Sequence, residues 1–166
     1  MRYPNKKEMR TLIAGLRYWG GLEILRGREI VLRGREVLLI PSELRDLVLS
    51  LKPYYCGIKI GDLSSKKFHL SLEGAYLISK VSSKKKVFVN EKAEMLVLYG
   101  RDVFGNSVTD ATQDIRENDE VMICNSFNEA IAIGRARVSW ERMKEPRVVV
   151  ENLRDRGWYT RECGTR

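Results

Sequence analysis

The chain has 166 residues, 43% of them apolar and 31% charged, which indicates one ordinary or two small globular domains. No apolar run approaches the roughly 18 residues of a membrane-spanning helix, and the first residues lack the apolar segment of a signal peptide. We therefore expect a cytoplasmic protein, or a nuclear or nucleolar one in a eukaryote. The net charge of +8 and the pI near 9.5 favour a polyanionic partner.

The positive charge is unevenly distributed along the chain. Residues 1–85 contain 17 Lys and Arg against 8 Asp and Glu, residues 86–134 contain 4 against 9, and residues 135–166 contain 9 against 5. If the chain binds nucleic acid, the first and last of these segments must supply the attraction, because the acidic middle segment would repel phosphate. The alternative is that these charges only solvate the surface, as in a heat-adapted protein.

Side chains that bind metals or carry out catalysis are few. Cys56, Cys124 and Cys163 form no Cys-x-x-Cys pair, and His69 is the single histidine, so we expect neither a zinc site nor a disulfide framework. The sequence also lacks a glycine-rich phosphate-binding loop, and its acidic residues are scattered among basic ones. We therefore expect a protein that is not an enzyme and that uses no metal or cofactor.

The first half of the chain predicts a small α+β domain with an antiparallel sheet. The capping-box pair Asn5 and Glu8 begins a helix that should end at Gly20. Residues 25–31 and 32–38 are near repeats, each with an Arg-Gly-Arg turn, and together they predict a three-stranded meander. The elements expected next are a helix over residues 42–52, a strand over 54–60, a loop over 62–66, a strand over 67–70 and a helix over 71–80.

The two Arg-Gly-Arg turns place four arginines at the turns of the expected meander. These residues are Arg26, Arg28, Arg33 and Arg35. Guanidinium groups at such turns could contact RNA phosphates or stack on bases. The alternative is that they are solvated and partly neutralised by nearby glutamates, which is the commoner situation for turn arginines.

The segment Ser-Ser-Lys-Lys-Lys at residues 82–86 predicts a solvated linker, because its composition is polar and basic. It places the domain boundary between residues 1–82 and residues 83–166. As an alternative, its three lysines could contact a phosphate backbone.

The second half of the chain predicts a strand-rich barrel. Asn90 caps a helix, and Gly100 ends it by adopting a left-handed conformation. Apolar residues alternate over 121–123 and over 131–133, which predicts a hairpin with one buried face. The other expected elements are a strand over 87–89, a loop through 105–106, a continuation of the second hairpin strand to 140, a strand over 148–150, and a terminal helix that opens at 152 or 153 and contains Trp158 and Tyr159.

The hairpin and the turn before it resemble the signature of the PUA domain, a small RNA-binding β-barrel. Residues 115–124 read Ile-Arg-Glu-Asn-Asp-Glu-Val-Met-Ile-Cys, and residues 130–136 read Ala-Ile-Ala-Ile-Gly-Arg-Ala. In PUA domains a turn of the Gly-Asp-x-Val type precedes the first of these strands. Here Asn118 replaces the glycine, and asparagine tolerates the positive φ that such a turn can demand.

The whole chain resembles the two-domain proteins of the Nip-seven type, which in eukaryotes are factors in biogenesis of the large ribosomal subunit and which also occur in archaea. Four segments carry the resemblance: Tyr-Cys-Gly-Ile-Lys-Ile-Gly at 55–61, Lys-Phe-His-Leu-Ser at 67–71, Val-Leu-Tyr-Gly at 97–100, and residues 147–159. The resemblance implies an N-terminal α+β domain followed by a C-terminal PUA pseudobarrel. It also implies a non-catalytic RNA-binding factor for pre-rRNA processing or large-subunit assembly, with rRNA and other assembly or RNA-processing proteins as partners.

In archaeal members of that family, basic residues of the terminal segment bind RNA. The matching positions here are Arg147, Val148, Glu151 and Arg154, and only the two arginines keep the charge. The resemblance therefore implies RNA contact at Arg147 and Arg154, while basic residues nearby in the sequence could replace the lost charges. Those nearby residues are Arg135, Arg137, Arg142, Lys144 and Arg156. The competing expectation is that Arg154 pairs with Glu151 on the terminal helix.

Two other functions stay open. One is a protein adapter, in which the acidic first half of the barrel docks a basic partner and RNA contact is incidental. The other is a PUA-containing translation factor that binds tRNA or a ribosomal subunit. For the RNA-binding factor we expect a single-stranded or looped RNA, bound by phosphate neutralisation and by stacking on Trp140 or Trp158.

Overall fold

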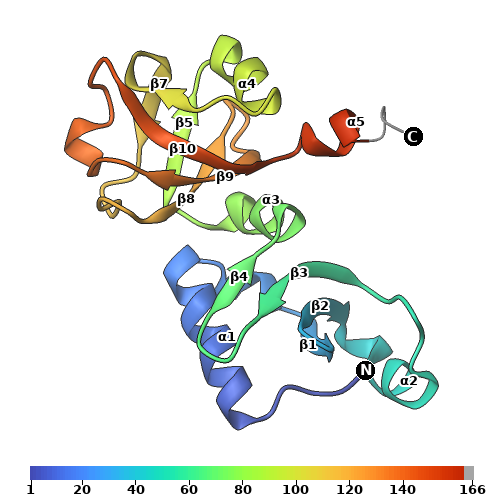
Figure 1. The fold of residues 1–166 in the computed structure, drawn as a ribbon. Coiled ribbons are helices and arrows are strands. Elements are labelled where there is room, and N and C mark those ends of the chain that lie inside the picture. Colours follow the sequence, from blue (N-terminus) through green and yellow to red (C-terminus); the bar gives the residue numbers. More distant parts are fainter. Residues whose placement is uncertain (163–166) are drawn as a thin grey trace. The chain divides into compact units, whose positions relative to one another are not determined.

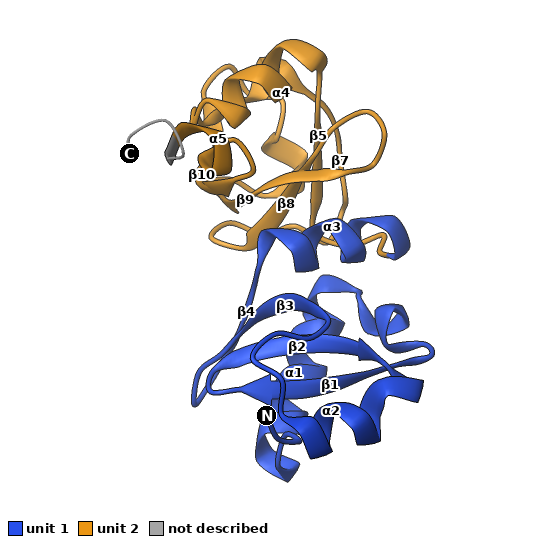
Figure 2. Ribbon diagram, turned by 90° about the vertical axis from the view of Figure 1, so that its right-hand side faces the viewer, with its two compact units in different colours: residues 1–81 blue, residues 82–166 orange. Residues whose placement is uncertain are grey.

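The computed structural model describes residues 1–162, and Cys163 of the cysteine prediction lies outside them. The chain folds as two units, Met1–Val81 (unit 1) and Ser82–Arg166 (unit 2), each built around its own sheet (Figures 1 and 2). The expected α+β class is confirmed, with an antiparallel sheet in unit 1 and a nearly closed barrel in unit 2.

Unit 1 contains a four-stranded antiparallel sheet with the strand order β1-β2-β3-β4. Its strands are β1 (Arg28–Arg33), β2 (Glu36–Pro41), β3 (Ile58–Leu63) and β4 (Phe68–Leu70). Its helices are α1 (Lys6–Trp19), α2 (Arg45–Leu51) and α3 (Leu72–Val81), with the short 3-10 helices η1 (Leu22–Leu25) and η2 (Ser42–Leu44).

The first helix begins where the sequence predicts it. The Asn5 side chain accepts hydrogen bonds from the backbone N–H groups of Lys7 and Glu8, and the Glu8 carboxylate accepts one from the Asn5 N–H, so the capping box is confirmed. The apolar stripe of α1 is buried, as its spacing requires; it consists of Leu12, Leu16 and Trp19.

The expected three-stranded meander is wrong, because only the second Arg-Gly-Arg copy joins two strands. The first copy follows η1, and its Arg26-Gly27 turn leads into β1. The meander required a strand before this turn, but the residues there form η1. Only Gly20 and Gly21 separate η1 from α1, so no room for a strand remains between the two helices. The outcome is the hairpin β1-β2, in which Arg33 pairs in register with Glu36.

Strand β3 is displaced from its predicted position. Lys52 and Gly57 have φ values of 45° and 67°, so the segment between them turns before the chain enters the sheet at Ile58. This turn leaves Tyr54 82% and Tyr55 71% exposed. The strand then continues to Leu63, through part of the expected loop, because its last residues pair with β4.

Unit 2 contains a six-stranded sheet with the order β6-β10-β9-β8-β5-β7. Its strands are β5 (Lys86–Val89), β6 (Val103–Phe104), β7 (Val108–Ala111), β8 (Glu120–Cys124), β9 (Ala130–Ala136) and β10 (Val148–Asp155). Strands β5 and β8 pair in parallel, and the other neighbours are antiparallel. Its helices are α4 (Glu91–Leu98), α5 (Trp158–Glu162), η3 (Gly105–Ser107) and η4 (Trp140–Arg142).

The predicted hairpin is confirmed as β8 and β9, with Val121 opposite Gly134 and Ile123 opposite Ala132. Asn118 has a φ of 69°, so the residue that replaces the usual glycine does adopt the left-handed conformation. Asn90 caps α4 through its side chain, and Gly100 follows the helix at a φ of 84°. The buried core of the barrel lies between these elements and is almost entirely aliphatic.

Three predictions for unit 2 are wrong. Strand β9 ends at Ala136 and does not reach Trp140, which begins η4. The expected loop after Gly100 contains β6 and β7. The predicted helix at 152 is instead the second half of β10, because the Asn152 N–H donates to Asp102 (2.8 Å) and the strand keeps its pairing with β9 as far as Asp155.

The expected solvated linker at residues 82–86 is also wrong, since Lys85 and Lys86 are only 8% and 2% exposed. The Lys85 ammonium lies 2.6 Å from an Asp119 carboxylate oxygen and 2.6 Å from the Asp114 carbonyl oxygen. The Lys86 ammonium donates to Asn128 at 2.7 Å. The alternative, in which these lysines contact a phosphate backbone, is therefore excluded for Lys85 and Lys86, whereas Lys84 is exposed.

The Asp114 carboxyl beside Lys85 stays charged. Burial alone would raise the pKa of Asp114, but hydrogen bonds from Thr112 and from the Lys85 N–H, together with the Lys85 charge, lower it below its ordinary value. The Asp119 carboxylate also accepts a hydrogen bond from the Arg116 N–H at 2.9 Å. The cation and the two carboxylates thus form one ion-pair cluster at the entrance to β5.

We expect Lys85→Met to lower the free energy of unfolding by about 3 kcal/mol, because it leaves two partly buried carboxylates without their cation. Urea denaturation followed by tryptophan fluorescence measures this change. The matched control Lys84→Met removes an exposed neighbour of the same type and should change stability by less than about 0.5 kcal/mol. Equal unfolding midpoints for the two variants would contradict the assigned role of Lys85.

The capping box also predicts a pH dependence. The hydrogen bond from Arg2, and next the one from the Asn5 N–H, lower the pKa of Glu8 to about 2 from the ordinary value of 4.5. Glu8 therefore stabilises the folded chain above its ordinary pKa, and this contribution disappears as the pH falls toward 2. In an NMR titration, Arg2→Gln should raise the pKa of Glu8 toward 4.5. The control Arg10→Gln should leave the pKa of Glu8 unchanged. If the pKa of Glu8 does not shift in Arg2→Gln, the pairing of Arg2 with Glu8 is refuted.

Candidate nucleic-acid interface

The six basic residues predicted to bind RNA all lie on the β9-β10 pair or on the segments next to it. Arg135 is in β9, Arg154 is in β10, and the other four directly flank these strands or lie in the connection between them. All six are exposed; they are Arg135, Arg137, Lys144, Arg147, Arg154 and Arg156. The antiparallel pairing thus brings residues from two separate parts of the sequence into one ribbon.

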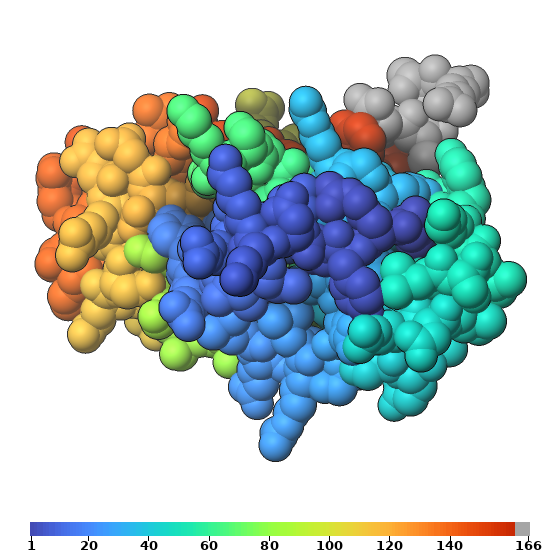
Figure 3. Space-filling model, turned by 90° about the horizontal axis from the view of Figure 1, so that it is seen from below, coloured from blue at the N-terminus to red at the C-terminus, as the bar shows by residue number. Residues whose placement is uncertain are grey.

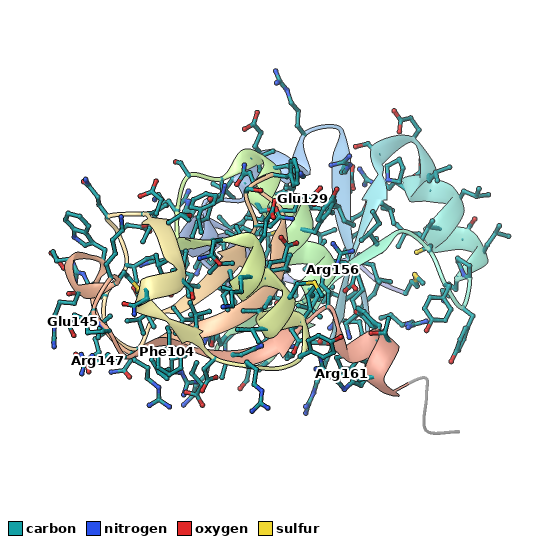
Figure 4. All side chains as sticks on the ribbon, turned by 90° about the horizontal axis from the view of Figure 1, so that it is seen from above. Phe104, Glu129, Glu145, Arg147, Arg156 and Arg161 are labelled. Atoms are coloured by element: carbon teal, nitrogen blue, oxygen red, sulfur yellow. The ribbon has the colours of Figure 1, made fainter. Side chains whose placement is uncertain are left out.

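The six residues form a line and not a compact cluster. Arg137 donates its backbone N–H to Val149 near the start of β10, whereas Arg156 donates its own to Ile131 at the start of β9. Figure 4 shows Arg147 near one end of β10 and Arg156 near the other. Nine residues of extended chain separate them, which corresponds to about 30 Å.

Several of these cations already have carboxylate partners. The Arg137 guanidinium lies 2.7 Å from Glu151, which is opposite Arg135 in the strand register. Glu145 binds two arginines at once, at 2.6 Å to Arg142 and 2.8 Å to Arg147. Ion pairs between solvent-exposed side chains are weak, so a phosphate can compete with the carboxylates.

The expected helical pair between Arg154 and Glu151 is wrong, because both residues lie in the strand β10. Residues three apart on a strand are about 10 Å apart, which is too far for the contact that a helix allows. Glu151 pairs with Arg137 instead.

The carboxylate of Glu145, which contacts both Arg142 and Arg147, remains charged. The hydrogen bond from Arg142 is the largest influence, and with the charges of Arg142 and Arg147 it outweighs burial and lowers the pKa of Glu145 below its ordinary value. The same bond raises the pKa of Arg142. Within the described residues, Arg135 and Lys144 have no carboxylate within ion-pair distance, so their charges face solvent directly.

Aromatic side chains are exposed along the same part of unit 2. Trp140 and Trp158, the two residues expected to stack on bases, are 37% and 50% exposed. The sequence did not reveal Phe104, which is opposite Val148 in the register and lies next to Arg147 in Figure 4. Strand β6 has only two residues, so it carries no alternation from which its exposed face could be predicted.

Helix α5 is held against the end of α4 by contacts that sequence reasoning missed. Arg161 binds both oxygens of the buried Asp155 carboxylate at 3.0 Å and also donates to the Leu98 carbonyl. Gly157 has no room for a side chain, since a Cβ there would lie 1.8 Å from the Leu98 oxygen. These contacts fix the position of α5, the helix that contains Trp158, next to the end of α4. They join residues far apart in the sequence, so local sequence patterns could not predict them.

In unit 1, the four turn arginines have different environments. Arg33 binds Glu36 at 2.6 Å and lies over the Tyr55 ring at 4.3 Å, and Arg28 donates to the Ile24 carbonyl. Arg26 and Arg35 are exposed. Arg28 is exposed as well, so three of the four turn arginines present their charge to solvent.

Two features are absent from residues 1–162. No helix there is long and apolar enough to cross a membrane. Within the same residues, no three His, Cys, Asp or Glu side chains come together in a way that could hold a metal ion.

Comparison with known proteins agrees with the two-unit fold. Residues 1–72 match the family model for the NIP7/UPF0113 pre-PUA domain, and residues 85–164 match the model for the UPF0113 PUA domain. A crystal structure of a hypothetical protein from the hyperthermophilic archaeon Pyrococcus horikoshii is similar to this chain with a TM-score of 0.65 and 22% identity, covering 95% of this chain and 96% of that one. At this level of identity the likeness shows the fold.

Sequence relatives fall into two groups. The tRNA-guanine(15) transglycosylase of Methanosphaera stadtmanae is 34% identical over 86 residues, which cover 52% of this chain but only 12% of that enzyme, so its activity is not carried over. A UPF0113 protein of Archaeoglobus fulgidus is 39% identical over 170 residues, covering 99% of this chain and 96% of that protein. With both domain models matched in order and a relative of similar length, the chain belongs to the NIP7/UPF0113 family of PUA-domain proteins.

Proposed function

We propose that this protein is a non-catalytic RNA-binding factor that contacts RNA along the β9-β10 ribbon. The observation that carries the proposal is the line of six exposed basic residues from Arg147 to Arg156, with exposed aromatic rings beside it. Cations at intervals along about 30 Å fit a phosphodiester backbone, and the rings fit unpaired bases. A single-stranded or looped RNA satisfies both requirements.

We further propose that the RNA is rRNA or its precursor, and that the protein acts in the cytoplasm in pre-rRNA processing or large-subunit assembly. Membership of the NIP7/UPF0113 family supports this role. The matches of both domain models favour an assembly factor over a translation factor that carries a PUA domain. Binding to tRNA is nevertheless a separate outcome that the same experiment can detect.

A protein adapter is the second candidate, because unit 1 exposes large apolar side chains on neighbouring turns of α2 and on the segment after it. These side chains are Leu47, Leu51, Tyr54 and Tyr55. Scattered apolar residues are common on protein surfaces, but several large ones along one short segment are typical of a protein contact.

We expect Arg147→Ala combined with Arg154→Ala to weaken binding to a U-rich RNA roughly tenfold and to make the salt dependence of log K shallower by about 1 to 2. Fluorescence anisotropy at several salt concentrations measures both quantities, with U-rich, A-rich, hairpin and tRNA probes. The double variant removes one cation from each end of the ribbon and changes no buried residue.

The matched control for this measurement is Arg116→Ala, which removes an exposed arginine from the acidic turn before β8. It should leave affinity and salt dependence unchanged, because its surroundings repel phosphate. Equal behaviour of the double variant and the wild-type chain would show that the ribbon is not the RNA-binding surface. A preference for tRNA over every other probe would favour the translation factor.

For the adapter, we expect Leu47→Ser combined with Leu51→Ser to abolish capture of a protein partner that survives nuclease treatment, without changing RNA affinity. Both side chains are exposed, so the fold should tolerate the change. Partners that disappear on nuclease treatment of the wild-type complex would argue against the adapter and for bridging by RNA.

A further inference from the structure

The two units contain equal numbers of Lys and Arg, but the net positive charge of the chain belongs almost entirely to unit 1. Residues 1–81 contain 15 Lys and Arg against 8 Asp and Glu, a balance of +7, whereas residues 82–166 contain 15 against 14, a balance of +1. In unit 2, moreover, several arginines and Lys85 are paired with carboxylates. The PUA unit is therefore a weak source of long-range attraction for a polyanion, and a stronger source lies in unit 1.

Helix α1 concentrates this charge on its solvent face. Lys6, Lys7, Arg10 and Arg17 are all exposed, and helical spacing places them within one sector of the surface. Within residues 1–162, none of the four has an ion-pair partner. The one acidic residue of the helix, Glu8, is engaged by Arg2 through two hydrogen bonds of 2.7 and 2.6 Å.

A cleft of about 350 Å³ lies beside the first turn of α1. Its walls come from α1, the β1-β2 turn and the β3-β4 turn, and they include Arg2, Lys7, Arg35, Ser64 and Ser65. Lys7 of α1 and Arg35 of the β1-β2 turn bring to this cleft two cations that have no carboxylate partners among the described residues. Figure 3 shows the dark-blue N-terminal segment and the start of α1 facing the viewer.

Gly34 lies at the edge of this cleft. Gly34 in the β1-β2 turn has a φ of 59°, which allows the tight reversal that presents Arg35, and no atom lies within 4 Å of the position that its Cβ would take. None of the residues that line the described cleft is aromatic. The cleft therefore offers charge and hydroxyl groups to a ligand, but no ring on which a base could stack.

The length of the basic face distinguishes among anionic ligands. Lys6 and Arg17 are separated by eleven residues of helix, which is about 16 Å. A single phosphate or a mononucleotide would fill the cleft and leave Arg10 and Arg17 without a role. A chain of phosphates can follow the cleft and the helix face together.

We propose that the cleft and the basic face of α1 bind the phosphodiester backbone of RNA, independently of base sequence. The inference rests on the proposed RNA-binding function and adds a second contact surface, in the pre-PUA unit. The cations of unit 1 then add to the salt-dependent affinity of the ribbon, while the aromatic rings beside the ribbon supply the contacts to unpaired bases.

The test compares the full-length wild-type chain with Lys7→Gln combined with Arg35→Gln, using the same U-rich RNA and salt series. We expect roughly a tenfold loss of affinity, a salt dependence shallower by about 1 to 2, and an unchanged preference among U-rich, A-rich and hairpin probes. The matched control is Arg26→Gln combined with Lys52→Gln, which removes two exposed cations of unit 1 that lie outside the cleft and α1.

The outcomes separate this inference from the proposed function. If Lys7→Gln with Arg35→Gln binds RNA as tightly as the wild-type chain does, the inference alone is overturned. It is also overturned if the Arg26 and Lys52 control loses as much affinity, because that would show an effect of net charge. A shifted preference among the probes would overturn the claim of sequence independence. No RNA binding by the wild-type chain would overturn the proposed function as well.

Discussion

The ion pair between Lys85 and Asp119 is the interaction on which the barrel of unit 2 depends. Lys85 has a φ of 54°, its N–H donates to Asp114, and its carbonyl accepts from Met122, so one residue joins the entrance of β5 to the acidic turn and to β8. A buried ammonium without these partners would cost several kcal/mol. The acidic turn of the PUA signature is thus explained by the counter-ion that it provides to Lys85.

Some charged residues of the chain stabilise the fold through buried or paired contacts, and others lie at the surface where a ligand can reach them. In unit 2, Lys85, Lys86 and Arg161 hold the barrel and α5 in place through contacts to Asp119, Asn128 and Asp155. In unit 1, the cations of α1 lie at the surface and Glu8 is already satisfied. Counting charges along the sequence therefore overstates what the second unit can offer to a polyanion.

Local patterns predicted much of the fold. The capping box at Asn5, the cap at Asn90 and the alternation over β8 and β9 were correct because each depends on a few neighbouring residues. The errors arose where distant contacts decide the outcome: β10 continues past Asn152 because Asp102, fifty residues earlier, accepts its N–H. The predicted meander failed for a similar reason, since two nearly identical segments meet different neighbours.

The candidate site was predictable only in part. The resemblance and the charge pattern identified all six basic residues of the ribbon, and the structure shows that each is exposed. Neither could show which carboxylate each arginine contacts, nor that Phe104 lies beside Arg147. Glu145 bridges Arg142 and Arg147. A polyanion reaches Arg147 and Arg142 only in competition with a carboxylate already in place, so a ligand with sparse charges gains little, and one with closely spaced phosphates gains at two arginines together. Glu145 thus favours the binding of ligands with closely spaced phosphates over ligands with sparse charges.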